Sequence, residues 1–539
     1  MKSHASNAGL PRSRVLSRLG LACAVFLALL AGLPAQGGHN HAPGEFVDHV
    51  HGAPRTEPYD PALVHAFRTL PVQDGGRIKP FESLAQVTLL RLNEKRSVSI
   101  PDEPMYGALA GDRLSAMEWA LDVLLYPDQA SDYPVFVVTD SEALRIIGLS
   151  DVAKRKRDRY SWNELAPGID RLRPYYDEYR RIEEKDRSRL QTQVVQLGND
   201  LAEYQGLQRV CDVARARFGV GDSKLLREAF GDVDGVRFSV AAAQADRLIA
   251  AFRALDASGA ANGDAVQAAE YTALADFLGR QLRMAQGSSA VAWLPPADLE
   301  TETWLDFSGV FDEIRADGAE AHAAQLAAIA KLESLIDATG NQGALSRAGQ
   351  DFVAHVRQMA DRRGEGDKID LEVSYHEADY FYRALQIFVL GFLLCAFGWL
   401  RPQMKLLYLG GWATSVLAAG LVVAGLTVRC ILLSRPPVST LYETIVFITA
   451  TAVLVALVAE AINKRRIALS LGAFVGALGM FVAGAFELLE QRDTLVELQA
   501  VLRTNFWLAT HVTSVTIGYA GGLLAGFIAH IYLLGKLLG

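Results

Sequence analysis

Five long apolar runs follow one another in the last third of this chain. They cover residues 381–400, 406–428, 438–459, 467–486 and 505–535. Each run is close to the ~20 residues that a helix needs to cross ~30 Å of hydrocarbon. Because a bilayer offers no water to backbone N–H and C=O groups, such runs cross it as helices. The pattern therefore predicts a bundle of about five transmembrane helices.

The long stretch at 59–377 is polar, and its apolar positions recur with a helical period. Alanine-rich and charge-rich sequences such as AHAAQLAAIAKLESLIDA are frequent, whereas the two-residue alternation of strands is scarce. Gly and Pro gather from Gly287 to Pro296, where we expect two parts of this stretch to meet. The predicted fold class is all-α: a mostly helical domain at 59–377, followed by a polytopic transmembrane domain at 378–539.

The N-terminus has the features of an export signal. Arg12, Arg14 and Arg18 precede the uncharged run LGLACAVFLALLAGL and the small-residue stretch PAQGG. The run is short for a transmembrane span, so residues 1–36 are predicted to be a secretory signal peptide. An uncleaved anchor is the alternative, and with either one the domain that follows is expected to be extracytoplasmic.

A linker rich in Gly, Pro and His is predicted at residues 37–58. His39, His41, His49 and His51 form an HxH pair that occurs twice. Neutral imidazoles at this spacing can bind zinc or copper, which makes these histidines weak candidates for a metal site. A solvated, histidine-rich tail is the alternative interpretation.

Composition and charge narrow the class of protein. Half of the residues are hydrophobic although 21 % are charged, and most of the charge lies before residue 380, which fits a polar domain joined to a membrane domain. The net charge of −8 argues against a nucleic-acid partner. The four cysteines include no CxxC pair, so neither a disulfide framework nor a cysteine metal site is expected, and a thiol reductant must come from another protein.

Export of the polar domain fixes the expected topology. The first span then runs inward, and the basic turns RPQMK and NKRR lie on the cytoplasmic side, in agreement with the positive-inside rule. The loops at 429–444 and 487–505 lie on the exported side, together with the beginning of the fifth span. Features of these three segments can therefore meet at one outer-face site.

His511 is the leading candidate for a functional residue, because an imidazole in a membrane helix costs free energy unless it has a partner. Trp507, Ser514 and Gly518 share its helical face. Haem, a flat ligand whose iron takes imidazole, would explain the histidine, the aromatic residue and the small residues together. A packing seam is the alternative. His530 is 19 residues further on, roughly 28 Å away at ~1.5 Å per residue, so the two histidines cannot share one iron.

Charged residues at the outer ends of the spans are further candidates. Arg429, Arg435 and Arg503 could bind anionic groups such as haem propionates, although snorkelling to the interface is the ordinary role of arginine there. Glu443 falls in the first turn of the third span, where a helix N-terminus favours a carboxylate. Capping is its expected role, and orienting a ligand or a histidine is the alternative.

Two motifs resemble a known family. RPPVSTLYETIVF, and about 60 residues later LRTNFWLATHVTSVTIGYAGG, look like the CcsA/ResC-type cytochrome c assembly protein, the haem-handling membrane subunit of System II cytochrome c biogenesis. LPVQDGGRIKPFESLAQ and DLEVSYHEADYFYRAL are similar to versions with a large extracytoplasmic N-terminal extension. The strong part of the resemblance covers about residues 370–539.

The resemblance implies a function at the outer face of the bacterial cytoplasmic membrane. A protein of this kind takes haem b as substrate, with His511 as an axial ligand of the iron, and presents the vinyl groups to the CxxCH thiols of an apocytochrome c. It also implies a ResB/CcsB-type membrane partner and a thiol-reducing partner, and it makes the chain part of a cytochrome c haem lyase complex. Holding the reactants together can supply much of the rate, so no general base is assigned.

The tryptophan-rich WWD segment and second external histidine of that family do not occur before Gly539. We therefore expect them from a downstream segment, or from a separate chain that packs against Ser514, Gly518 and Gly522.

Two other functions stay open. An ion or small-solute transporter would use His511 and Glu443 on a polar pathway, and a membrane-anchored periplasmic scaffold would use the spans only as an anchor.

Overall fold

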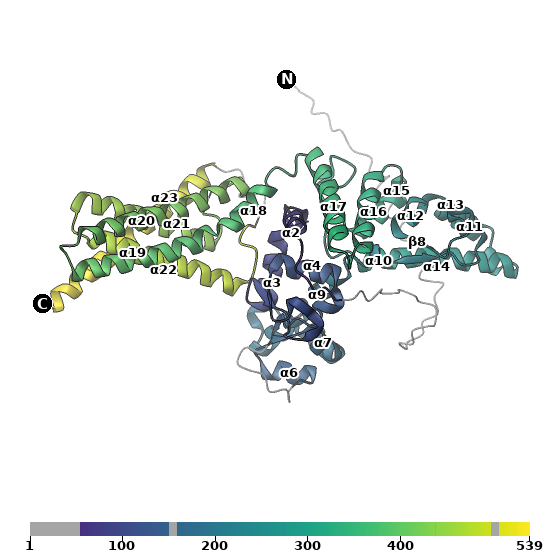
Figure 1. Cartoon of the computed structure of the whole chain (residues 1–539), viewed down its shortest axis with the longest axis horizontal. Helices are drawn as coiled ribbons and strands as arrows, with labels where there is room; N and C mark the ends of the chain where they lie inside the picture. Colours follow the sequence, from purple (N-terminus) through teal and green to yellow (C-terminus); the bar gives the residue numbers. More distant parts are fainter. Residues whose placement is uncertain (1–53, 150–158, 437, 497–505, 539) are drawn as a thin grey trace, which may run out of the picture. The chain divides into compact units, whose positions relative to one another are not determined.

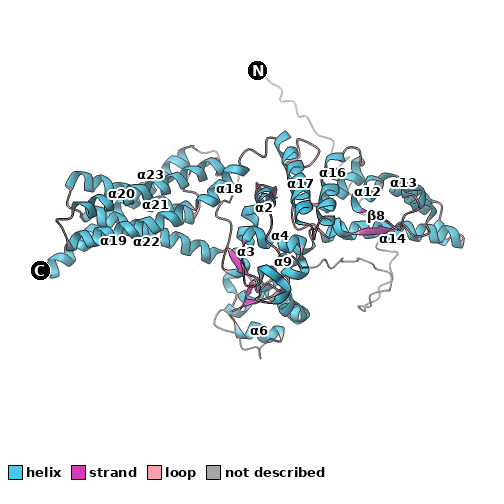
Figure 2. Ribbon diagram, viewed as in Figure 1, coloured by secondary structure: helices cyan, strands magenta, loops and turns pink. Residues whose placement is uncertain are grey.

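The computed structural model describes residues 54–149, 159–436, 438–496 and 506–538. Helices dominate it, and the strands are few and short (Figure 2). Five of the described helices are long and apolar enough to cross a membrane. The predicted all-α class with about five membrane spans is confirmed.

The polar domain is assembled mainly from helices of four to 23 residues. Its α-helices are α2 (Pro61–Arg68), α3 (Phe81–Asn93), α4 (Ala116–Leu125), α5 (Pro127–Ala130), α6 (Ser141–Ile147), α7 (Trp162–Leu165), α8 (Ile169–Tyr179), α9 (Arg189–Arg209), α10 (Asp212–Arg215), α11 (Lys224–Phe230), α12 (Phe238–Ala243), α13 (Ala245–Ala257), α14 (Ala265–Gly287), α15 (Phe307–Asp317), α16 (Ala323–Asp337) and α17 (Gln342–Arg362). Short 3-10 helices occur at Pro104–Leu109, Ala166–Gly168, Glu184–Asp186 and Ala260–Asn262.

The strands of the described part pair into four antiparallel two-stranded sheets. They are β1 (Pro71–Asp74) with β2 (Arg77–Pro80), β3 (Ser97–Ser99) with β4 (Arg113–Ser115), β5 (Phe136–Val137) with β6 (Arg159–Tyr160), and β7 (Arg217–Gly219) with β8 (Gly235–Arg237). In the first pair Asp74 lies opposite Arg77, and Gly75 and Gly76 make the turn with φ angles of 61° and 80°. Only glycine adopts this left-handed turn without strain, so the Gly-Gly pair fixes a tight hairpin.

One hydrophobic core joins side chains from residue 59 to residue 360. The stretch from Gly287 to Pro296 does not separate two cores: Val291, Trp293 and Leu294 are buried within this one. The amide of Gln73 on β1 also donates to the carbonyl of Ala292 at 2.8 Å. Backbone pairing and an aromatic side chain therefore build this stretch into the core.

A buried ion pair lies inside the polar domain. The carboxylate of Asp122 on α4 is 0 % exposed and accepts from the Arg55 guanidinium at 2.9 and 2.8 Å. It also accepts from the hydroxyls of Tyr59 at 2.7 Å and Tyr133 at 2.9 Å. Burial, together with the neighbouring carboxylate, raises the pKa of both tyrosines, so they stay protonated donors. These four hydrogen bonds satisfy a charge that would otherwise be costly to bury.

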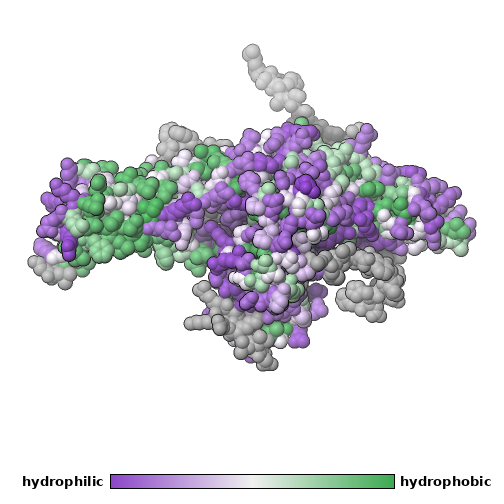
Figure 3. All heavy atoms as spheres, viewed as in Figure 1, coloured by the Kyte–Doolittle hydropathy of each residue, from purple (hydrophilic) through white to green (hydrophobic). Residues whose placement is uncertain are grey.

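The membrane helices are α19 (Tyr380–Leu400), α20 (Lys405–Leu433), α21 (Leu441–Asn463), α22 (Ile467–Glu490) and α23 (Phe506–Leu538). The short helix α18 (Ile369–Ala378) leads into α19. Figure 1 shows α19 to α22 running alongside one another, and Figure 3 shows hydrophobic side chains gathered over their surface. Small residues bring the helices close: a Cβ at Gly479 would lie 2.0 Å from the Thr449 hydroxyl oxygen. Outward apolar side chains and close packing are what a lipid environment requires.

Helix α23 packs on α21 with little of its surface covered. Phe527 contacts a buried cluster that includes Ala452 and Ala456. A Cβ built at Gly518 or Gly522 would meet no atom of the described residues within 4 Å. Within that part of the chain, the small-residue face of α23 has open space beside it.

The polar domain contacts one end of the bundle, at the loops that follow α20 and α22. Lys368 donates to the Leu432 carbonyl at 2.9 Å and to the Ser434 hydroxyl at 2.7 Å, and Lys79 forms an ion pair with Asp493. The turns at 401–405 and 463–466 precede α20 and α22, so they lie at the opposite end of the bundle. There Arg466 donates to the Pro402 carbonyl at 2.9 Å. The loops after α20 and α22 therefore lie on the domain side of the bundle.

Candidate functional site

Arg429, Glu443 and Arg435 form a buried Arg–Glu–Arg cluster at the domain-facing ends of α20 and α21. They are 1 %, 1 % and 8 % exposed. One carboxylate oxygen of Glu443 accepts from both guanidinium groups, at 3.1 Å each, and the other accepts from the Ser439 amide at 3.1 Å. A single carboxylate is thus shared by two arginines in a place shielded from solvent.

Local structure explains why these side chains meet. Ser434 ends α20 in the left-handed region with φ of 50°, and the Arg435 amide then donates back to the Cys430 carbonyl at 3.3 Å. Thr440 caps α21 by accepting from the Glu443 amide at 3.2 Å, which places Glu443 in the first helical turn. Unpaired N–H groups at a helix N-terminus favour a negative charge at this position.

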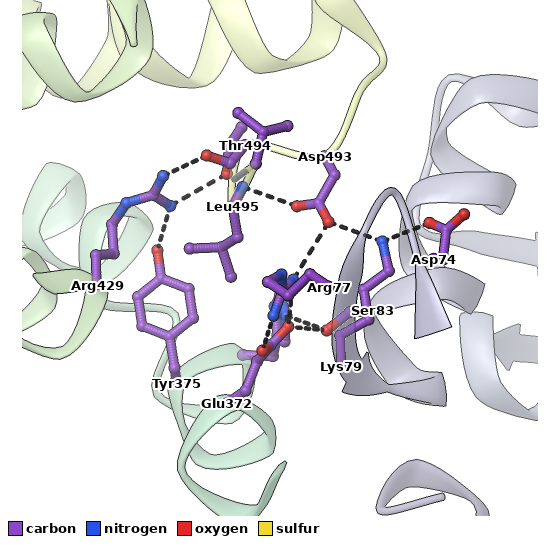
Figure 4. Close-up of polar contacts among 12 residues, drawn as sticks. Asp74, Arg77, Lys79, Ser83, Glu372, Tyr375, Arg429, Asp493, Thr494 and Leu495 are labelled. Atoms are coloured by element: carbon purple, nitrogen blue, oxygen red, sulfur yellow. Dashed lines mark hydrogen bonds and ion pairs between the residues drawn. The ribbon is translucent and has the colours of Figure 1, made fainter. Parts of the chain in front are cut away.

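The segment Asp493–Val496, which follows α22, covers the arginines from the other side. Arg429 donates to the Thr494 carbonyl at 2.6 Å and to the Thr494 hydroxyl at 3.1 Å (Figure 4). The Tyr375 hydroxyl lies 3.2 Å from the same guanidinium group, and Arg435 donates to the Val496 carbonyl at 3.0 Å. The acceptors that Thr494, Val496 and Tyr375 present to the two arginines are neutral oxygens.

The first residue of this 493–496 segment is held by the polar domain. The Asp493 carboxylate accepts from Lys79 at 2.9 Å and from Arg77 at 3.4 Å, both on strand β2 (Figure 4). Lys79 also pairs with Asp74 at 2.6 Å, and Arg77 also pairs with Glu372 on α18. The hairpin β1–β2 therefore clamps the segment through two cations, each of which has a second carboxylate partner.

These ion pairs set the charge states of the clamp. Burial alone would raise the pKa of Asp493, but the positive charges of Lys79 and Arg77 outweigh it and lower the pKa to about 2. Burial lowers the pKa of Lys79 and Arg77, and their carboxylate partners more than offset this and raise both. The clamp is therefore fully charged throughout the neutral range.

The stability that Asp493 contributes should depend on pH only in strong acid. Its pKa is about 2 in the folded chain against an ordinary 3.8, so the contribution is complete above pH ~4 and is lost as the pH falls through about 2. A shift of this size corresponds to about 2–3 kcal/mol. We expect Asp493→Asn to lower the thermal unfolding temperature of the detergent-solubilised protein at pH 7, and to have an effect about one third as large at pH 2.5, just above the folded pKa. A deficit of equal size at both pH values would contradict this assignment, and Asp74→Asn is the matched control.

The structure brings together Arg429, Arg435 and Glu443, three of the residues singled out from the sequence. Arg429 does not snorkel, since it is buried with its charge satisfied by the protein. Glu443 lies in the first turn of α21, as predicted, and contacts both arginines. Ser514 and Gly518 lie on α23.

Other predicted site residues fall where less is described. His511 and Trp507 belong to the first turns of α23, but their side chains lie outside the described residues. Arg503 and the linker histidines also lie outside them; these are His39, His41, His49 and His51. The exposed His530 lies one turn from Gly526, and its Nδ1, when protonated, donates to the Gly526 carbonyl at 2.7 Å.

Sequence reasoning missed Arg77, Lys79 and Asp493. The Gly-Gly pair between two short alternating segments was a usable hairpin signal. No local signal indicates that the hairpin meets a loop more than 400 residues away, since Arg77 and Asp493 are 416 residues apart.

Two further observations bear on the site. Within the described ranges no group of three or more His, Cys, Asp or Glu side chains is arranged to hold a metal ion. Comparison of the chain with protein-family models and with curated proteins found no match.

Proposed function

We propose that this protein handles haem b at the outer face of a bacterial cytoplasmic membrane and delivers it for covalent attachment to apocytochrome c. The observation that carries the proposal is the Arg–Glu–Arg cluster at the domain-facing end of the bundle. Arg429 and Arg435 share one carboxylate, and each also donates to a neutral carbonyl oxygen of the 493–496 segment. Two neighbouring arginines of this kind suit a carboxylate ligand, such as a haem propionate, because guanidinium and carboxylate groups match in shape and charge.

The remaining requirements of haem are met in part by α23. Gly518 and Gly522 leave open space beside the helix among the described residues, which a flat macrocycle could fill. His511, in the first turns of α23, is the proposed axial ligand of the iron, and Trp507 and Ser514 are its proposed neighbours in the pocket. In this proposal Glu443 holds the two arginines in position.

The chain's contribution to the reaction is binding and orientation. Thioether formation adds a cysteine S–H across a vinyl double bond of haem: the sulfur bonds to one carbon and the hydrogen to the other, so no atom is lost. Fixing the macrocycle relative to the CxxCH segment of an apocytochrome c can supply much of the rate. The reduced thiols would come from a thiol-reducing partner, and a ResB/CcsB-type membrane protein would complete the haem lyase complex.

The proposed location follows from the same reasoning. Residues 1–36 would export the polar domain as a signal peptide or anchor, and the domain-facing end of the bundle would then be the outer end. Lipid would surround the apolar outward side chains of the bundle.

Substitution of the proposed ligand gives a direct test. Purified His511→Gly protein, loaded with haem, should lose most of its Soret absorbance, because the iron loses an axial bond. Added imidazole should restore part of it by occupying the vacated position. His530→Gly is the matched control, since it removes an exposed imidazole from the same helix and should leave the absorbance unchanged. Equal haem content in His511→Gly and wild type would refute the ligand assignment.

The distribution of charge disfavours the transporter. Asp, Glu, Lys and Arg side chains of the five spans lie near the helix ends, as Arg429, Glu443 and Glu460 do. Glu460 accepts from the Tyr408 hydroxyl at 3.0 Å and from the Arg466 amide at 2.7 Å, so it closes the end of the bundle opposite the polar domain. A pathway for ions would place such groups nearer mid-membrane.

A membrane-anchored scaffold is the second candidate, and the ion pairs that dock the polar domain on the bundle favour it. It predicts that wild-type protein takes up no haem.

A further inference from the structure

The 493–496 segment lies between the Arg–Glu–Arg cluster of the bundle and the charged residues of hairpin β1–β2. Toward the bundle, the carbonyl and hydroxyl oxygens of Thr494 and the carbonyl oxygen of Val496 accept from Arg429 and Arg435. Toward the polar domain, it offers the single carboxylate of Asp493. Its hold on the rest of the protein is therefore a small set of polar contacts at its two faces, together with the buried side chain of Leu495.

If this segment moved away, each arginine or lysine that it contacts would keep another partner of opposite charge. Arg429 and Arg435 keep Glu443 at 3.1 Å. On the domain side, Lys79 keeps Asp74 and Arg77 keeps Glu372. Because removing the only partner of a buried charge is what makes such a change costly, this arrangement allows the segment to leave at a modest cost.

The positions that the segment would vacate suit an anion. The two terminal nitrogens of Arg429 point at the oxygens of Thr494, 2.6 and 3.1 Å away, in the paired geometry that a carboxylate can also accept. The Nε of Arg429 is buried and has no acceptor among the residues that the structure describes. Arg429 therefore has one N–H group without an acceptor among the described residues. An ionised carboxylate in place of the neutral oxygens of Thr494 would bind its guanidinium group more strongly.

We propose that the 493–496 segment is a displaceable latch over a carboxylate-binding site at Arg429 and Arg435, and that hairpin β1–β2 holds the latch closed through Arg77 and Lys79. The carboxylate oxygens of the ligand take the positions that the oxygens of Thr494 and Val496 occupy beside the two arginines. The inference rests on the proposed function for the nature of the ligand, a porphyrin with propionate groups, and it gives the polar domain a role in controlling access to the site.

The latch itself is tested without ligand, by amide hydrogen exchange of the full chain in lipid nanodiscs. Asp493→Asn removes the clamped charge, so peptides that contain residues 493–496 should exchange about 30- to 100-fold faster. Asp74→Asn is the matched control: it removes the same charge from the same hairpin, but Lys79 keeps Asp493 as its partner. Exchange in this control should be unchanged or slower.

The site under the latch is tested with metal-free protoporphyrin IX, which has both propionates but no iron for His511. Its fluorescence should report binding to Asp493→Asn about 3- to 10-fold tighter than to wild type, because the latch no longer competes. Protoporphyrin IX dimethyl ester, which has no ionised carboxylate, should bind both proteins alike. Arg429→Gln, or Arg435→Gln should the first fail to fold, should abolish the gain in an Asp493→Asn background.

Each contrary outcome removes a defined part of the proposal. Unchanged exchange in Asp493→Asn means that the hairpin does not hold the segment, and the latch is rejected. Faster exchange without tighter porphyrin binding means that the arginines are not a carboxylate site, while the His511 test of haem binding still stands by itself. Equal tightening for the acid and the ester points to exposed apolar surface and also overturns the inference.

Discussion

Replacing Glu443 with alanine is expected to destabilise the bundle by about 3–5 kcal/mol, because it leaves two buried guanidinium groups without their shared carboxylate. The carbonyl oxygens of Thr494 and Val496, which accept from the two arginines, are neutral and cannot replace the lost charge. The measurement is the thermal unfolding temperature of the purified protein in detergent, with the yield of monodisperse protein as a second readout.

A matched control separates burial from charge. Glu487→Ala also removes a glutamate from an arginine, but the Arg96–Glu487 pair is 44 % and 24 % exposed, so the expected loss is below about 1 kcal/mol. Replacing Glu443 with leucine together with Arg429→Met and Arg435→Met should restore much of the stability, because no charge is then left unpaired. If this triple variant is no more stable than Glu443→Ala, the cost comes from packing and the electrostatic explanation is wrong.

Replacing Asp122 with alanine should have an effect of similar size in the polar domain. Arg55 would lose its buried ion-pair partner, and the hydroxyls of Tyr59 and Tyr133 would lose their acceptor. We expect a loss of about 3–5 kcal/mol in the free energy of unfolding. Urea unfolding of the full chain, followed by far-UV circular dichroism and by tryptophan fluorescence, measures it.

Two further substitutions define what that result means. Asp170→Ala removes a carboxylate that is 93 % exposed, and it should leave the unfolding curve almost unchanged. Asp122→Asn keeps the shape of the side chain and one acceptor, so its effect should fall between those of the two alanine variants. A loss of stability in Asp122→Ala no larger than in Asp170→Ala would show that this ion pair does not stabilise the domain.

The membrane helices were the most predictable part of the structure. A bilayer demands about 20 apolar residues in a row, and a run of that kind is visible without knowledge of any contact. Helix α22 was predicted at 467–486 and is observed as Ile467–Glu490; α19 was predicted at 381–400 and is observed as Tyr380–Leu400. The differences lie at the ends, where a helix continues past the hydrocarbon into polar residues such as Glu487.

The polar domain shows where periodicity stops being informative. Its helical content was predicted, but the short strands were not, because strands of two to four residues are too short to display alternation. The hairpin at Gly75 and Gly76 is the exception, since a Gly-Gly pair is a turn signal that could have been used. The stretch from Gly287 to Pro296 misled in the opposite direction: its Gly and Pro suggested a junction, whereas Trp293 buries it in the core.

For the candidate site, the sequence by itself determined which residues were unusual. Arg429, Arg435 and Glu443 stand out because charged side chains at the ends of apolar runs are costly and therefore conspicuous. Only the tertiary structure decided that the three share one buried carboxylate, and that the 493–496 segment and a hairpin far away in sequence close over them. The physical reason is that a charged side chain beside an apolar run is visible in the sequence, whereas its burial and the partner that offsets the cost of burial depend on how distant segments pack.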